Sequence, residues 1–90
     1  MAGMVLMGVL DLRASAPLQA ELLALRGQDL RLDASGVRQL GGQCLQVLLA
    51  ATSCWQADGQ AFAVAAPSAA FVAALALFGA ALPIVEGVGP

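Results

Sequence analysis

The sequence predicts one α/β domain that contains a mixed, mostly parallel β-sheet of about four strands and three main α-helices. Short apolar segments with a period of two alternate along the chain with longer segments whose apolar residues recur at helical spacing. Such alternation favours parallel pairing through right-handed crossovers. The length of 90 residues allows a single domain over 1–90, and a hydrophobic content of 60% supplies the side chains for its core.

The first strand is expected at residues 4–7, and residues 8–11 turn out of it. Ser15 is a residue type that caps helix N-termini, and Pro17 suits the first turn of a helix. This first helix is expected to end at Gly27, because glycine accepts the left-handed backbone of a C-cap. Its apolar stripe consists of Leu18, Leu22 and Leu25.

A second strand at residues 30–34 leads through a loop into the longest helix, expected from Gly42 to Ala57. Gly41 and Gly42 allow the backbone to turn where a side chain would clash. At 100° per residue, one face of this helix is apolar and the other is small and uncharged. The apolar face consists of Cys44, Leu45, Val47, Leu48, Ala51 and Trp55. The opposite face consists of Gln43, Gln46, Ala50, Ser53 and Ala57.

A third strand is expected at residues 61–65, and Ser68 is the expected N-cap of a third helix that ends at Gly79. A final short strand is expected at residues 82–85, where Pro83 restricts it to a sheet edge. The core face of the third helix is predicted to consist of Phe71, Val72, Leu75 and Phe78.

The residue types in the chain exclude several classes of function. A net charge of −2 argues against binding of nucleic acid, which needs a basic surface. The sequence contains no His, Lys or Tyr, so it lacks the usual general base and the lysine of a phosphate-binding loop. Two cysteines without histidine do not form a structural zinc site. We therefore expect no enzymatic activity, no metal and no cofactor.

The pattern of apolar residues and cysteines favours a cytoplasmic protein. The uncharged stretch at residues 60–85 contains Pro67 and Pro83, and the remainder is shorter than the roughly 20 residues of a membrane span. No secretory signal is visible. Cys44 and Cys54 lie about 15 Å apart along one helix, so they cannot bridge each other. We interpret them as small buried apolar groups in a reducing compartment, with a reactive thiol as the alternative.

Two carboxylates are expected near the Gly41-Gly42 loop. Asp11 and Asp33 each follow a predicted strand, and the carboxyl ends of parallel strands lie at one edge of a sheet. Together they would offer oxygen ligands to a cation, whereas separately they would cap turns. We favour the capping roles.

Residues 32–37 (Leu-Asp-Ala-Ser-Gly-Val) and 40–45 (Leu-Gly-Gly-Gln-Cys-Leu) resemble the STAS domain family of bacterial anti-sigma-factor antagonists. Similar motifs at residues 8–11, 58–59, 66–68 and 78–84 extend the resemblance over about residues 5–86. The family pattern has Leu-Asp-x-Ser-x-Val and then Asp-Ser-Ser-Gly-Leu opening a helix. The resemblance therefore implies a STAS-like fold and a protein-binding function.

The chain departs from the family pattern at the phosphoacceptor. Gly41 stands at the loop aspartate, Gly42 at the phosphoacceptor, and Cys44 at the family glycine. The positions Asp11, Asp33 and Ser35 keep family residue types. Ser35 would be the substitute acceptor, but we favour a capping role for it. The resemblance also implies a shortened first strand and a sheet edge open to a partner.

We expect binding that is constitutive rather than gated by phosphate. The resemblance implies a bacterial signalling partner, either an anti-sigma factor or switch kinase or a chemotaxis signalling protein. The alternative is an accessory subunit that binds the ATPase of a lipid-transport ABC complex. An uncharged helix face costs little to desolvate, so it suits docking, although an ordinary solvated face has the same composition. The expected surface consists of Gly41, Gly42, Gln43, Gln46, Ala50 and Ser53. We expect a monomer or a weak homodimer.

Overall fold

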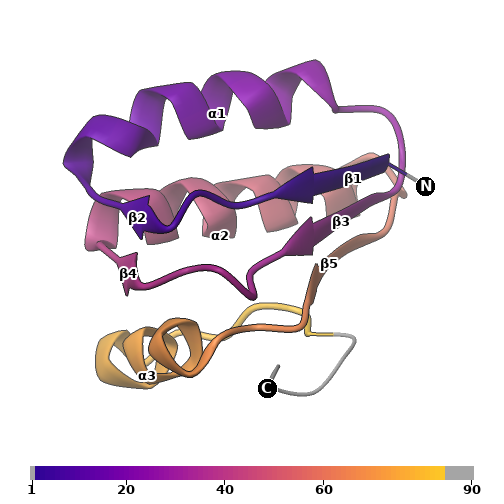
Figure 1. The fold of residues 1–90 in the computed structure, drawn as a ribbon. Coiled ribbons are helices and arrows are strands. Elements are labelled where there is room, and N and C mark those ends of the chain that lie inside the picture. The colour runs from indigo at the N-terminus through magenta and orange to yellow at the C-terminus, as the bar shows by residue number, and fades with distance from the viewer. Residues whose placement is uncertain (1, 85–90) are drawn as a thin grey trace.

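The computed structural model describes residues 2–84, which form an α/β domain with two groups of parallel strands and three α-helices (Figure 1). The elements are β1 (Ala2–Val5), β2 (Val9–Leu10), a 3-10 turn η1 (Leu12–Ala14), α1 (Ser15–Ala24), β3 (Leu30–Asp33), β4 (Gln39–Leu40), α2 (Gly42–Ala57), β5 (Phe62–Ala65) and α3 (Ala69–Phe78). The predicted fold class is confirmed.

The main sheet has the order β1-β3-β5, and both of its strand pairs are parallel. Leu32 in the central strand lies opposite Met4 on one side and Val64 on the other. The chain segments that continue from β1 and β3 pair again as β2 and β4, with Leu10 opposite Leu40. This second pairing brings the turn after β2 beside the start of α2, where the expected site lies.

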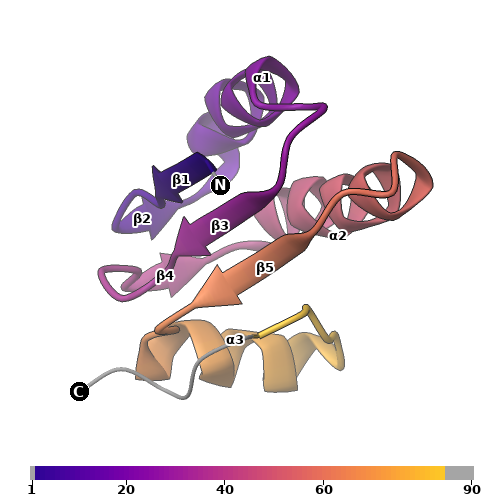
Figure 2. The same cartoon turned by 90° about the vertical axis from the view of Figure 1, so that its right-hand side faces the viewer.

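The helices and strands enclose one apolar core. Figure 1 and Figure 2 place α1 and α3 at opposite ends of the molecule, with the strands between them. Trp55 of α2 packs at 5.3 Å between ring centroids against Phe62 of β5, and its Nε1 donates to the carbonyl of Gln28 at 2.8 Å. The largest fully buried side chains are Trp55, Phe71, Leu10, Leu30, Leu32, Leu48, Val37 and Val64.

The last predicted strand is reduced to a single bridge within the described residues. Ile84 forms a parallel bridge with Val64, whose N–H donates to the carbonyl of Pro83 at 2.7 Å. Val85, the last residue of that prediction, lies outside the described residues.

The first strand and the first helix begin and end differently from the prediction. The strand lies at Ala2–Val5 instead of 4–7, because Ala2 is already in register with Leu30. The N-cap prediction for Ser15 is wrong: Ser15 is the first residue of α1, and its hydroxyl donates to Leu12. The helix ends at Ala24, before Gly27.

The predicted caps of the third helix are confirmed, but part of its predicted core face is wrong. The Ser68 hydroxyl accepts a hydrogen bond from the N–H of Phe71, and Gly79 has the left-handed φ of 64°. Phe78 is 48% exposed instead of buried. Phe71 and Leu75 occupy the inward positions, so Phe78, three residues later, falls at the border of the buried stripe, and Val72 is only partly buried.

Candidate functional site

Helix α2 begins at a close backbone contact with the turn after β2. The N–H of Gly41 donates to the carbonyl of Leu10 at 2.8 Å, and the carbonyl of Gly41 accepts from Leu45 at 3.1 Å. A Cβ at residue 41 would lie 3.2 Å from the same Leu10 oxygen. The backbone of Gly41 is extended, with φ −86° and ψ 165°. Glycine is therefore needed here for space, not for an unusual backbone angle.

Gly42 lies in a different environment from Gly41. A Cβ at residue 42 would lie 3.7 and 3.8 Å from two ring carbons of Phe78, which is ordinary van der Waals contact. The space at the first position of α2 therefore accommodates a side chain. Steric crowding at the Cβ therefore does not require glycine at residue 42.

An open groove of about 550 Å³ lies between the start of α2 and the end of α3. Three residues of the expected docking surface, Gly42, Gln43 and Gln46, line this groove. We define the α2–α3 groove by all its lining residues, which are Gly42, Gln43, Leu45, Gln46, Leu49, Phe78 and Ala80. None of these residues is charged, so the groove presents apolar surface with amide groups at its border.

A smaller pocket of about 80 Å³ lies on the other side of α2, against α1. Ala50 of the expected surface lines this pocket rather than the groove, together with Leu23, whose side chain is 57% exposed. The complete lining consists of Gln19, Leu22, Leu23, Arg26, Val47, Ala50, Ala51, Cys54 and Trp55. Helix α2 therefore presents a ridge with a hollow on each side.

The predicted exposure of the outer face of α2 is confirmed. Gln43, Gln46, Ala50, Ser53 and Ala57 are all exposed, while the opposite face is buried except for the partly buried Val47. Four residues that line the groove are not among the predicted surface residues: Leu45, Leu49, Phe78 and Ala80. Only the position of Phe78 directly before the helix-ending Gly79 marks it as a residue at the border of the core.

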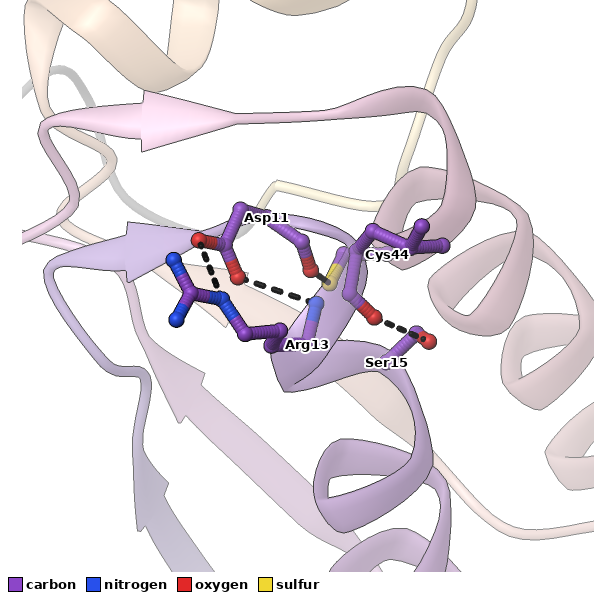
Figure 3. A network of polar contacts seen from close by, with 5 residues as sticks. Asp11, Arg13, Ser15 and Cys44 are labelled. Atoms are coloured by element: carbon purple, nitrogen blue, oxygen red, sulfur yellow. Dashed lines mark hydrogen bonds and ion pairs between the residues drawn. The ribbon is translucent and has the colours of Figure 1, made fainter.

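Asp11 caps the turn before α1 and lies beside the start of α2 (Figure 3). Its carboxylate accepts a hydrogen bond from the N–H of Arg13 at 3.1 Å, and the guanidinium of Arg13 lies at 4.0 Å. The backbone carbonyl of Asp11 accepts from the thiol of Cys44 at 3.3 Å. The side chain thus performs the capping role that we favoured.

The Cys44 thiol is buried at the base of this contact. Burial raises the pKa of the Cys44 thiol, and the nearby negative charge of Asp11 raises it further. The group therefore stays a neutral thiol, which fits a structural role. Cys54 is only partly buried, so the predicted burial holds for Cys44 alone, and both cysteines are free.

Asp33 and Ser35 form a separate turn at the end of β3. The carboxylate of Asp33 accepts from the N–H of Ser35 at 2.9 Å, and hydrogen bonding from the side chain and backbone of Ser35 lowers the pKa of Asp33. The carbonyl of Asp33 accepts from Leu6 of the neighbouring segment. The structure therefore brings Asp11 to the start of α2, whereas Asp33 and Ser35 cap their own turn. Within residues 2–84, no group of three or more acidic or cysteine side chains is arranged to hold a metal ion.

The other end of α2 is tied to the turn after α1 by a bidentate ion pair. Nε of Arg26 donates to Oδ2 of Asp58 at 2.8 Å, and Nη2 donates to Oδ1 at 3.2 Å. The hydrogen bond from Arg26 lowers the pKa of Asp58, and the attraction between the two charges lowers it further. This ion pair holds the turn after α1 against the end of α2, and its Arg26 lines the smaller pocket.

Comparison with known proteins gives one family. The family model described as "Mlab, STAS domain" matches residues 2–86 of the chain. No curated protein and no solved structure matches the chain. Among the helices of residues 2–84, none combines the length and the apolar content that crossing a membrane requires.

Proposed function

Because the chain belongs to the STAS domain family, we propose that it is a protein-binding module whose docking does not depend on a phosphate at the start of α2. STAS domains are generally non-enzymatic binding modules. The observation that carries the proposal is Gly42, which leaves no hydroxyl at the first position of α2 although a Cβ would fit there.

The composition of the α2–α3 groove supports binding of an uncharged surface. Phosphorylation at a helix N-terminus acts by adding about two negative charges to a docking surface. This groove contains no charged side chain, and Phe78 at its border is 48% exposed. A partner covers such a surface without removing an ion from water, and an exposed aromatic ring supplies apolar contact area.

The ridge of α2 supplies the polar part of the same surface. Gln46 lines the groove, and Ala50 lines the pocket on the other side, so a partner seated across α2 reaches both hollows. Ser53 continues the ridge and is exposed. Small residues between two apolar hollows permit close approach of a partner, which is the arrangement of a well-packed interface core.

A charged substitution on the ridge tests the docking surface. We expect Gln46→Arg to weaken binding to the recovered partner by about tenfold or more, because it buries an unpaired charge. Gln56→Arg is the matched control, because it makes the same change at an exposed position of α2 outside both hollows. Isothermal calorimetry measures both affinities. An unchanged affinity for the Gln46→Arg chain would remove this face from the interface.

The class of partner is tested by co-purification with the intact chain followed by mass spectrometry. We propose a bacterial signalling protein, either an anti-sigma factor or switch kinase or a chemotaxis signalling protein. The alternative partner is the ATPase of a lipid-transport complex. The lack of a hydroxyl at Gly42 supports this alternative, because a permanent subunit of a complex does not need a phosphate to control its binding. Recovery of a transporter ATPase instead of a signalling protein would decide for the alternative.

The independence from phosphate is tested separately. The purified chain is incubated with the recovered kinase and ATP, and its intact mass is measured. We expect no added phosphate, because Gly42 has no hydroxyl and Ser35 belongs to the turn at the end of β3. A phosphate on Ser35 would contradict the proposal, and Ser35→Ala would then identify the acceptor.

A further inference from the structure

The outer edge of β1 carries backbone groups that point away from the sheet. β1 is the first strand in the order β1-β3-β5 and pairs with β3 only, among the strands that the structure describes. On the side that faces β3, the N–H of Ala2 donates to the carbonyl of Asp29 and the N–H of Leu6 donates to the carbonyl of Asp33, both at 2.9 Å. Because a strand alternates with a period of two, Gly3 and Val5 direct their N–H and C=O groups to the open edge.

This edge is exposed and carries no protecting charge. Gly3 is exposed, and Val5 is 74% exposed. Charged residues and prolines commonly prevent an edge strand from pairing with another chain. Residues 2–10 contain neither. The charged residues nearest in register are Arg31 and Asp33, which lie opposite Gly3 and Val5 on the neighbouring strand β3. Glu21 of α1 lines a small hollow together with Val5.

We propose that two copies of this chain pair through β1 as antiparallel edge strands, with Gly3 opposite the partner's Val5. In this register both Gly3–Val5 pairs exchange their outward N–H and C=O groups, which gives about four backbone hydrogen bonds around a two-fold axis. The register also seats each exposed Val5 side chain over a glycine. A Cβ built on Gly3 meets nothing within 4 Å, so this position has room for the valine.

A second copy fits this edge better than a different protein. The strand β1 itself carries no charge, and the positive Arg31 and negative Asp33 beside it on β3 favour neither an acidic nor a basic partner. The Gly3/Val5 spacing is complementary to itself when the strand is reversed, because the exposed Val5 then faces the open space at Gly3. The net charge of −2 is small, so two copies repel each other weakly. The paired copies leave the α2–α3 groove open, because β1 lies at the opposite edge of the sheet from α3 (Figure 2).

Analytical ultracentrifugation of the full chain from about 1 µM to about 1 mM tests the proposal. We expect the mass to rise from 9.0 kDa toward twice that value. Val5→Lys places two like charges about 7–8 Å apart across the pair, so it should weaken dimerisation by about tenfold or more. Leu77→Lys is the matched control, since Leu77 is 84% exposed on α3. Circular dichroism confirms that both variants fold.

Hydrogen exchange locates the interface independently of any substitution. The amides of Gly3 and Val5 should become protected as the concentration rises, while exposed amides elsewhere should not change. A chain that stays monomeric at about 1 mM would overturn the proposal. A dimer that survives Val5→Lys, dissociates with Leu77→Lys, or leaves the two amides unprotected would also overturn it. These outcomes are distinct from failure of the docking site on α2, which Gln46→Arg tests.

Discussion

The adjacent glycines Gly41 and Gly42 should respond to alanine with opposite signs. At Gly41 the new methyl group would lie 3.2 Å from the Leu10 carbonyl, which is a backbone atom that also accepts the Gly41 N–H. At Gly42 the methyl group would lie at 3.7 Å or more from the Phe78 ring, without a clash. The pair therefore separates a glycine that space requires from one that it does not.

The magnitudes follow from the local structure. Overpacking against backbone costs about 1–3 kcal/mol, and alanine is also a poorer N-cap than glycine, so Gly41→Ala should lower the free energy of unfolding by that range. The φ of −86° is open to alanine, so no term for backbone angle is added. Gly42→Ala should raise the free energy of unfolding by up to about 1 kcal/mol, because alanine in a helix restricts the unfolded chain.

Urea titration followed by fluorescence measures both changes. Trp55 is the one tryptophan of the chain and is buried, so its emission reports global unfolding. For a domain of this size, 1 kcal/mol corresponds to a shift of about 4–8 °C in Tm, which differential scanning calorimetry resolves. Equal effects at Gly41 and Gly42, or a neutral Gly41→Ala, would refute the reasoning about the contact with Leu10.

Three further predictions concern a cap, an ion pair and the thiols. Ser68→Ala should lower the free energy of unfolding by about 1–2 kcal/mol in urea titration, because it removes the N-cap of α3. Arg26 lowers the pKa of Asp58, so the charged carboxylate stabilises the folded chain. The unchanged chain should therefore have a higher free energy of unfolding than the Asp58→Asn chain at pH 7, and this difference should disappear as pH falls below about 4 and the carboxylate is protonated. An advantage that persists in acid would contradict that assignment. A thiol reagent should modify Cys54 before Cys44 in intact-mass measurements, since burial raises the pKa of the Cys44 thiol.

Much of the candidate site follows from local sequence. The helical spacing after Gly42 defines which side chains of α2 are inward, so the exposure of Gln46 and Ala50 is predictable without a structure. That Gly42 carries no hydroxyl is a property of the residue type alone. The caps Ser68 and Gly79 are equally local, because each satisfies backbone groups within one turn of its own helix.

The parts that the sequence did not predict depend on contacts between distant segments. The α2–α3 groove joins Gly42 to Phe78, and no periodicity within either helix shows that the two helices meet there. The start of α1 is likewise not predicted: Asp11 caps η1, which leads directly into α1, so that Ser15 lies inside the helix and Ala14 is its N-cap without a side-chain hydrogen bond.

The sequence by itself determined the alternation of strands and helices, the uncharged outer face of α2 and the lack of a side chain at Gly42, because periodicity and residue type are properties of a single segment. Tertiary structure alone decided that Phe78 borders a groove and that β1 is an edge strand of the sheet formed by the described residues. The physical reason is that apolar patterning specifies which face of an element is buried, whereas the packing of neighbours decides what covers it.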